Sequence, residues 1–191
     1  MAVSKTKPVE LLTECYNEGQ RHFGENYVQE IVQKAPLLPA DIQWHFIGHL
    51  QSKKCKPLLT AVPNLFVVEG VDSENLATKL DNACKALGRE PLRIFIQVNT
   101  SGEDSKSGVS PDGCVALARF VSSSCPHLHL SGLMTIGKFG DKSPKYFEVV
   151  IAAFSHFCLM DLLVFVGVQA ACHGRFRAGP FGTEHGNVRR L

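Results

Sequence analysis

The sequence predicts an α/β fold, namely an incomplete eight-stranded β/α barrel of the TIM type in which about six to seven strands are present. Short apolar runs alternate with amphipathic segments six times, roughly 20 to 35 residues apart, as in wound parallel sheets and barrels. The chain has 191 residues, whereas a full barrel typically needs about 250. The rival architecture, a doubly wound open sheet, would normally carry a Gly-x-Gly-x-x-Gly turn after its first strand, and the sequence has none.

The first half of the chain supplies three strand-helix units. Pro8 stands where the first turn of a helix tolerates proline, and the apolar residues that follow it recur at helical spacing. The predicted strands are 2–4, 21–24 and 42–47, and the predicted helices are 8–16, 28–32 and 53–61.

The second half supplies three further units with clearer boundaries. Ser73 is a suitable N-cap for a helix over 73–87, and Gly88 is a suitable terminator. The run 92–98 is almost entirely apolar, which is typical of a parallel strand buried on both faces. The predicted strands are 65–68, 92–98 and 128–136, with helices at 73–87 and 111–122, another helix beginning near Pro144, and a weak seventh strand at 162–168.

Composition excludes several classes of function. A net charge of +2 is too small for a polyanion-binding surface, so no nucleic-acid partner is predicted, and Lys53, Lys54 and Lys56 are interpreted as a solvated helix face. The apolar stretch 154–172 contains His156, Asp161 and Gln169, so it lacks the roughly 18 uninterrupted apolar residues of a membrane span.

The seven cysteines form an odd set without Cys-x-x-Cys spacing, at positions 15, 55, 84, 114, 125, 158 and 172. They are interpreted as reduced thiols that act as small hydrophobic residues, rather than as disulfides or zinc ligands. Reduced thiols predict a reducing compartment. We expect the cytoplasm, with the mitochondrion as the alternative, and no secretory signal precedes Ala2.

Candidate functional residues follow the predicted strands, because barrel active sites lie at the carboxyl ends of the strands. The set is Lys5, Glu25, Asn26, His45, His49, Glu69, Asn99 and Thr135. Each has a simpler alternative. A lysine after a strand is usually solvated, a histidine between Trp44 and Phe46 is often a hydrogen-bonded core residue, and Glu25 and Asn26 could cap the next helix.

Lys5 differs from a surface lysine because it directly follows a buried strand and precedes the turn formed by residues 6–8. Its amine could therefore point into the barrel mouth. Desolvation there would favour the neutral amine, which is nucleophilic toward an aldehyde.

Two other kinds of chemistry find little support. His45 and His49 are four residues apart, but they flank a strand end and no His-Glu-x-x-His pattern occurs, so no metal site is predicted. A serine hydrolase of the α/β type needs a Gly-x-Ser-x-Gly elbow, which is missing.

Several of these residues lie in motifs through which the chain closely resembles the pyridoxal phosphate homeostasis proteins. The matching runs are AVSKTKP (2–8), FGENYVQE (23–30), WHFIGHLQ (44–51), QVNTSGE (97–103), SKSG (105–108) and GLMTIG (132–137). The resemblance covers about residues 2–149, and its motifs are long enough to be specific.

The resemblance implies a barrel of the alanine racemase N-terminal type that binds pyridoxal 5'-phosphate (PLP). Lys5 would carry PLP as a Schiff base, and Asn26, Met134 and Thr135 would line the cofactor pocket. The family binds PLP and influences vitamin B6 balance without an established catalytic turnover. The implied function is intracellular PLP homeostasis, with PLP and PLP-dependent apo-enzymes as partners, and a monomer is expected.

The resemblance stops near Val150, which divides the chain into a barrel portion at 1–149 and a divergent tail at 150–191, expected to be poorly ordered or packed in a non-native way. The Ser-Met-Gly-Met-Ser and Gly-Ser-Thr-x-Val-Arg segments, which cradle the phosphate in the family, are absent, and so is the N-terminal helix that precedes the first strand. An alternative transcript or a faulty gene model would explain both, since His185-Gly186 is what a Met-Gly codon pair gives out of frame.

Two other interpretations remain open at this point. A PLP-dependent amino-acid racemase would need a proton-transfer residue opposite Lys5, usually a tyrosine, and Tyr16, Tyr27 and Tyr146 are the candidates. Alternatively, a product that lacks two strands and the phosphate-binding segment would fold poorly and have no function, because exposed strand edges and core surface are liabilities.

Overall fold

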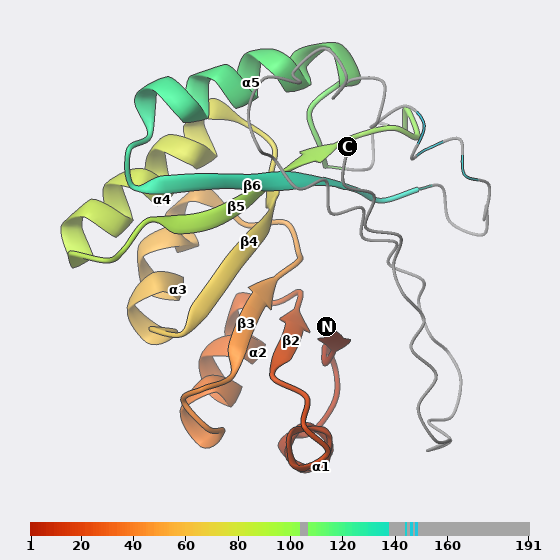
Figure 1. Cartoon of the computed structure of the whole chain (residues 1–191), viewed down its shortest axis with the longest axis vertical. Coiled ribbons are helices and arrows are strands. Elements are labelled where there is room, and N and C mark those ends of the chain that lie inside the picture. Colours follow the sequence, from red (N-terminus) through yellow and green to blue (C-terminus); the bar gives the residue numbers. More distant parts are fainter. Residues whose placement is uncertain (104–106, 138–143, 145, 147, 149–191) are drawn as a thin grey trace.

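A computed structural model describes residues 1–103, 107–137, 144, 146 and 148. Within these residues six parallel strands form one sheet whose spatial order follows the chain (Figure 1). A doubly wound sheet would reverse its strand order at a switch point, whereas a barrel does not. The predicted incomplete β/α barrel is therefore confirmed. The strands are β1 (Ala2–Val3), β2 (His22–Glu25), β3 (Gln43–Phe46), β4 (Leu65–Val71), β5 (Leu92–Val98) and β6 (Leu128–Thr135).

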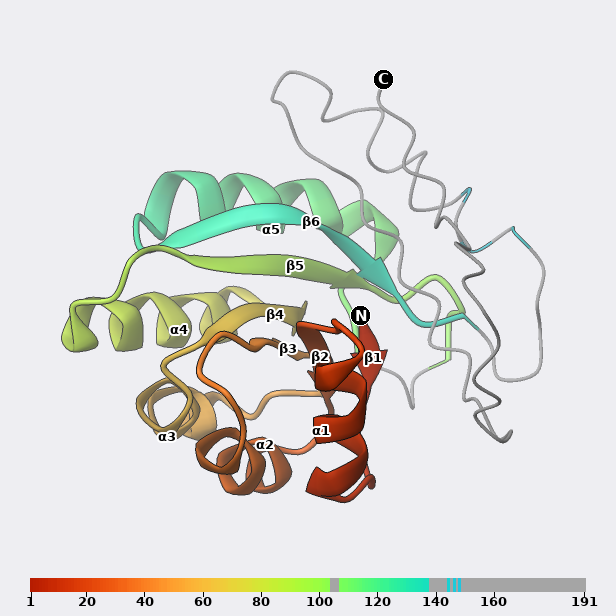
Figure 2. The same cartoon turned by 60° about the horizontal axis from the view of Figure 1, so that its bottom comes forward.

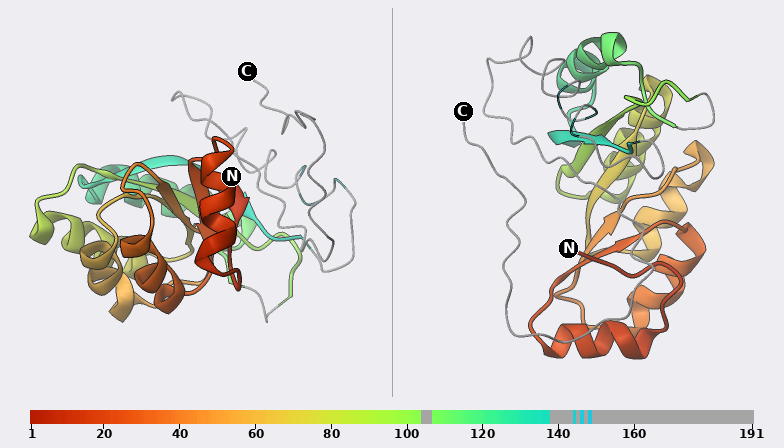
Figure 3. Two further views of the ribbon diagram at one scale, coloured as in Figure 1. Left: turned by 90° about the horizontal axis from the view of Figure 1, so that it is seen from below. Right: turned by 90° about the vertical axis from the view of Figure 1, so that its right-hand side faces the viewer.

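The helices alternate with the strands and follow the outer face of the curved sheet, as Figure 2 shows with the bottom of the molecule turned forward and Figure 3 shows from below and from the side. One-sided coverage of this kind leaves the opposite face of the sheet to form the barrel interior. The helices are α1 (Val9–Asn17), α2 (Val28–Lys34), α3 (Cys55–Ala61), α4 (Glu74–Leu87) and α5 (Pro111–Ser124), with short 3-10 turns η1 (Ala35–Leu37) and η2 (Ser52–Lys54).

The elements with the clearest sequence signals form as predicted. The Ser73 hydroxyl accepts a hydrogen bond from the Leu76 N–H, and Gly88 ends α4 in the left-handed conformation at φ 61°. β5 spans the predicted residues, and α5 begins at Pro111 behind a Ser110 cap. Short-range patterns were therefore sufficient to place these elements.

The core has two parts, one on each face of the sheet. The larger part lies between the sheet and the helices and includes the fully buried Phe23, Trp44 and Ile94. The smaller part consists of Val67, Phe95 and Met134, with Phe66 and Ile136 against it. Because side chains alternate between the faces of a strand, this second cluster marks the barrel interior.

Some boundaries were predicted wrongly. β4 runs to Val71 instead of ending at 68, because Glu69 is buried and bonded within the sheet and Gly70 packs against the backbone of Gly48. The predicted strand at 21–24 lies one residue later, at His22–Glu25, and β1 ends at Val3. Ser4 nevertheless remains bonded to the next strand through its N–H and the Gly24 carbonyl.

Of the elements predicted after β6, only the start of the helix near Pro144 falls within the described residues. The Glu148 N–H donates to the Pro144 carbonyl at 3.2 Å, which is the spacing of a helical turn. The predicted seventh strand at 162–168, the stretch 154–172 and the tail at 150–191 lie outside the described residues. Within the described part, no helix is long and apolar enough to span a membrane.

The cysteines of the described part are all free thiols, as predicted. Cys55, Cys84, Cys114 and Cys125 are buried and Cys15 is half-buried, while positions 158 and 172 lie outside the described residues. Burial raises the pKa of the Cys55 and Cys114 thiols to about 11. These side chains therefore act as small apolar residues.

Candidate functional site

The loops that follow the parallel strands meet at one end of the sheet, here called the carboxyl rim. Lys5 follows β1, Asn26 follows β2, His49 follows β3 and Asn99 follows β5, while Thr135 is the last residue of β6. The structure thus brings most of the predicted candidates to the same end of the barrel, although each makes different contacts.

Two glycines let the backbone segments at this rim touch. A Cβ atom at Gly48 would lie 2.1 Å from the carbonyl oxygen of Asn26, and one at Gly70 would lie 2.7 Å from the carbonyl oxygen of Gly48. No side chain fits at such distances, so the close packing of the β2, β3 and β4 ends depends on glycine. Asn26 is half-buried beside this contact.

Lys5 occupies the second position of a tight turn at the end of β1. The Lys7 N–H donates to the Ser4 carbonyl at 3.1 Å, and Thr6 has a φ of 60°. A positive φ at the third residue of a turn is the geometry of a type II turn. Val3 pairs with Gly24, and the Ser4 hydroxyl donates to Glu25, so Lys5 comes directly after the last residue that is bonded to β2.

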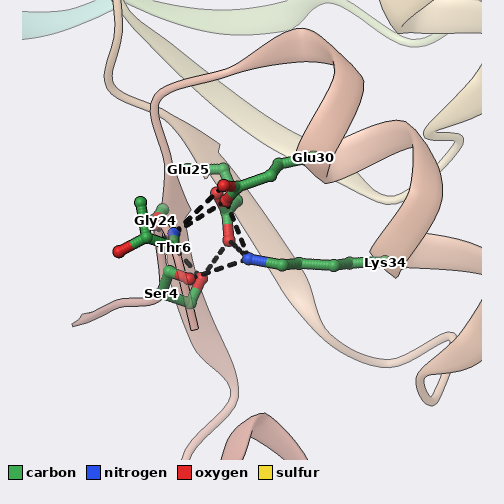
Figure 4. A network of polar contacts seen from close by, with 6 residues as sticks. All are labelled: Ser4, Thr6, Gly24, Glu25, Glu30 and Lys34. Atoms are coloured by element: carbon green, nitrogen blue, oxygen red, sulfur yellow. Dashed lines mark hydrogen bonds and ion pairs between the residues drawn. The ribbon is translucent and has the colours of Figure 1, made fainter. Parts of the chain in front are cut away.

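Behind Lys5, on the outer face, lies a dense polar network (Figure 4). The Lys34 amine donates to the Ser4 carbonyl at 2.8 Å, to Glu25 Oε1 at 2.7 Å and to Glu30 Oε2 at 2.9 Å. The Ser4 hydroxyl also donates to Glu25 Oε1, at 2.7 Å. Lys34 therefore uses all three of its N–H groups, and α2 is fastened to the end of β1.

The two carboxylates of this network differ in acidity. Burial raises the pKa of Glu25, and the neighbouring Glu30 carboxylate raises it further, although Lys34 and Ser4 act in the opposite direction. Burial also opposes ionisation of Glu30, but hydrogen bonds with Lys34, Glu25 and the Thr6 N–H outweigh it and lower its pKa. Glu25 is thus the carboxylate that holds a proton more readily.

This network corrects one sequence-based alternative. Glu25 does not cap the following helix, since Tyr27 is the N-cap residue of α2 and makes no side-chain capping bond. The Glu25 carboxylate instead is fully buried between β1 and α2. The requirement to compensate a buried lysine explains its position.

A chain of three polar residues crosses the inner face of the sheet. The His45 Nδ1 atom lies 2.6 Å from Glu69 Oε1, and its Nε2 atom lies 2.9 Å from His22 Nδ1. Phe66 packs edge-on against His22. Burial lowers the pKa of His22, and so do the neighbouring His45 and the chain N-terminus. His45 and Glu69 are therefore hydrogen-bonded interior residues, which agrees with the simpler alternative for His45.

His49 is exposed and separate from His45. Its Nδ1 atom lies 3.0 Å from the Ser107 hydroxyl and 3.7 Å from Asp72 Oδ2. Within the described residues no cluster of three or more His, Cys, Asp or Glu side chains has the arrangement of a metal site.

The remaining candidates stabilise the rim on the β5 and β6 side. Asn99 Oδ1 accepts from the Ser101 hydroxyl and the Gly102 N–H, each at 3.1 Å, so this side chain shapes its own loop. The Thr135 hydroxyl donates to the Val98 carbonyl at 2.9 Å and joins β6 to β5. Met134 is buried in the inner cluster.

Sequence reasoning missed Ser4, His22, Glu30 and Lys34. The one available signal was the i,i+4 spacing of Glu30 and Lys34, which indicates a helical ion pair. That spacing is common on solvated helices, so it did not reveal a lysine buried against β1 and β2.

The described residues fit one end of the cofactor implied by the resemblance. PLP requires a primary amine that is accessible and not held in an ion pair, and within the described residues no hydrogen bond or ion pair is found for the half-buried Lys5 amine. The segments that would bind the phosphate, by the resemblance, are absent from the sequence.

Comparison with protein families identifies residues 1–161 as an alanine racemase N-terminal domain. The chain is 50% identical over 146 residues to the pyridoxal phosphate homeostasis protein of Mus musculus, covering 73% of this chain and 53% of that protein. It is 51% identical over 141 residues to the pyridoxal phosphate homeostasis protein of Schizosaccharomyces pombe, covering 74% and 58%. The chain thus spans between half and three-fifths of these relatives.

Solved structures give the same relationship. The structure is similar to PipY of Synechococcus elongatus without PLP, with a TM-score of 0.71 and 33% identity, covering 81% of this chain and 72% of PipY. It is also similar to PipY with PLP bound, with a TM-score of 0.66 and 30% identity, covering 82% and 74%.

Proposed function

Since the chain belongs to the alanine racemase N-terminal domain family, in the group of pyridoxal phosphate homeostasis proteins, we propose that it binds PLP on Lys5 and takes part in intracellular PLP homeostasis. Its relatives carry that name, and PipY has a structure with PLP bound. The assignment of Lys5 follows from the resemblance of the run AVSKTKP (2–8) to that family.

The observation that carries the proposal is the contrast between two neighbouring lysines. The Lys34 amine is buried and donates three hydrogen bonds, two of them to carboxylates, so it acts as a fixed cation. Lys5, one residue from Ser4, is half-buried at the carboxyl rim and takes no part in these bonds. In this proposal its amine points to the opposite, inner face of the sheet. Barrel enzymes and binding proteins place their reactive groups at that rim.

When bound, PLP supplies an aldehyde to which a primary amine forms a reversible Schiff-base linkage with release of one water. In this proposal Lys5 provides the amine and Asn26 faces the site from the next loop. Met134 contributes apolar wall from the inner cluster, and Thr135 holds the β6 end in place through its bond to the Val98 carbonyl.

We assign the chain a binding role and not a catalytic one. A racemase needs a second proton-transfer group opposite the lysine. The Tyr16 hydroxyl is engaged with Asp41 on the outer side at 2.7 Å, and Tyr27 is 53% exposed. Tyr146 is buried next to Gly137, where a Cβ atom on the glycine would lie 3.0 Å from the Tyr146 ring.

The proposed partners are PLP and PLP-dependent apo-enzymes, with the chain acting as a monomer in the reducing environment of the cytoplasm.

The test is an absorbance titration of the purified chain with PLP, followed by borohydride reduction and peptide mass spectrometry. We expect an absorbance band to the red of free PLP and a reduced adduct on Lys5. Lys5→Ala should abolish both, whereas the matched control Lys7→Ala, an exposed lysine two residues along, should retain them. We expect weak affinity for PLP, because charge-assisted contacts with the phosphate normally supply much of the affinity and the family's phosphate-binding segments are absent here.

An adduct on another lysine, or none on the wild-type chain, would overturn the proposal. Racemisation of an amino acid that is lost in the Lys5→Ala variant would instead favour the racemase interpretation.

A further inference from the structure

Thr6, the residue after Lys5, has a strained backbone conformation. Its φ of 60° lies in the left-handed region, and it is the one residue other than glycine with a positive φ in the described part of the chain. Threonine is β-branched and adopts this region at a cost in free energy, so the surrounding contacts must hold it there. The turn that presents Lys5 therefore depends on something outside itself.

Glu30 supplies that support. The Thr6 N–H donates to both carboxylate oxygens of Glu30, at 2.9 and 3.1 Å. Glu30 also accepts a hydrogen bond from Lys34 at 2.9 Å, and this bond helps to hold the carboxylate in its orientation toward the Thr6 N–H (Figure 4). A charge-assisted bond to a backbone N–H is among the stronger hydrogen bonds in proteins.

The same lysine fixes the residue on the other side of Lys5. The Lys34 amine donates to the Ser4 carbonyl, and the Ser4 hydroxyl donates to the Glu25 carboxylate that Lys34 neutralises. The backbone is thus held immediately before and immediately after Lys5, by side chains from β2 and α2. Lys5 itself takes no part in this network.

We propose that Glu30 and Lys34 are positioning residues for Lys5, which clamp the strained Ser4–Lys7 turn so that the Lys5 amine is directed into the barrel. This inference rests on the proposed function, because it concerns the reactivity of the same amine. In the described part of the chain, the polar contacts of these two residues reach Ser4, Thr6 and Glu25 and not Lys5, so their effect on Lys5 is transmitted through the backbone.

The experiment measures how fast Lys5 forms its adduct with pyridoxal, the aldehyde without a phosphate, by stopped flow and by borohydride trapping with mass spectrometry. Pyridoxal isolates the amine from any phosphate contact. Glu30→Ala is the main variant, since Glu30 is 26% exposed in its side chain and its removal leaves the buried Lys34–Glu25 pair intact. Asp41→Asn, which breaks the exposed Arg21–Asp41 pair, is the matched control.

We expect Glu30→Ala to slow the adduct rate by about tenfold, because the strained Thr6 backbone would relax and the turn would lose its shape. Asp41→Asn should leave the rate unchanged. The decisive step is Thr6→Gly, because glycine adopts a positive φ without strain. In the Thr6→Gly background the Glu30→Ala change should slow the rate by about twofold or less. A purely structural or long-range electrostatic role for Glu30 would give the same loss in both backgrounds.

Lys34 is tested by a conservative pair of variants. Lys34→Arg keeps the charge and should retain most of the adduct rate. Lys34→Met should slow the adduct rate by at least as large a factor as Glu30→Ala does. All rates are measured where Trp44 fluorescence shows the variant to be folded. A wild-type rate in Glu30→Ala, or an equal loss in the Thr6→Gly background, would overturn the inference while leaving the proposed function intact. Absence of any Lys5 adduct in the wild-type chain would overturn both.

Discussion

Replacement of Lys34 by methionine tests how strongly the fold depends on one buried cation. The Lys34 side chain is 9% exposed, and its partner Glu25 is fully buried. The substitution leaves the Glu25 carboxylate with the Ser4 hydroxyl as its remaining donor. Removing one partner of a buried ion pair costs about 3–5 kcal/mol, because the other charge remains desolvated. Since domains are stable by only about 5–15 kcal/mol, such a loss is large.

Glu25→Gln is the matched comparison and should cost far less. Glutamine keeps an oxygen that accepts from Ser4 and Lys34, and Lys34 still has the Glu30 carboxylate. We expect a loss of about 1 kcal/mol, the usual size of a weakened hydrogen bond. In thermal unfolding, where each 1 kcal/mol shifts the midpoint by about 2–4 °C, the Lys34→Met shift is then roughly 6–20 °C.

The pH dependence gives a second test with a definite sign. Burial raises the pKa of Glu25, and Lys34 is one of the groups that oppose this rise, so Lys34→Met raises it further. A carboxyl group whose pKa is raised on folding favours the folded state at low pH, and this contribution is lost as pH rises through the folded-state pKa. The deficit of Lys34→Met should therefore be smaller at about pH 5 than at about pH 8.

Urea unfolding followed by fluorescence suits this comparison, because the chain has a single tryptophan and Trp44 is fully buried. A Lys34→Met deficit below about 1 kcal/mol, or one equal to that of Glu25→Gln, would contradict the reasoning, since the buried pair is expected to be asymmetric. A deficit independent of pH would show that Glu25 does not titrate as the structure implies.

Three further predictions concern other parts of the fold. The pKa of His22 is lowered by burial, so the free energy of unfolding should fall as pH drops below about 6.5, and the fall should be shallower in His22→Gln. Gly48→Ala should destabilise the chain by about 1–3 kcal/mol in urea and weaken PLP binding, because its Cβ atom would meet the Asn26 carbonyl. Cys55 and Cys114, whose pKa is raised to about 11, should resist iodoacetamide at about pH 8 until urea is added.

The elements that were predicted well are those whose signals are local. The cap at Ser73, the terminator at Gly88 and the apolar run of β5 each depend on a few consecutive residues, and all fold as expected. The end of β4 was missed because Glu69 and Gly70 are typical of a loop. Only contacts with His45 and Gly48, more than twenty residues earlier, make them part of a strand.

The candidate site divides in the same way. The rule that reactive groups follow barrel strands placed Lys5 and Asn26 at the rim. It gave no indication of the network behind Lys5, because lysine on an amphipathic helix normally faces solvent. The burial of Lys34 depends on Glu25, nine residues earlier on β2, and on Ser4, thirty residues earlier and directly after β1.

The network also explains why a chain that spans little more than half of its relatives still holds the turn around Lys5 in place. Every residue that holds the turn around Lys5 lies between β1 and the end of α2, so these contacts form within the first two strand-helix units. Any contact between later loops and the phosphate of PLP would add affinity to an amine whose turn is already held. The positioning of Lys5 is therefore tested with pyridoxal, by comparing variants with the wild-type chain toward the same aldehyde.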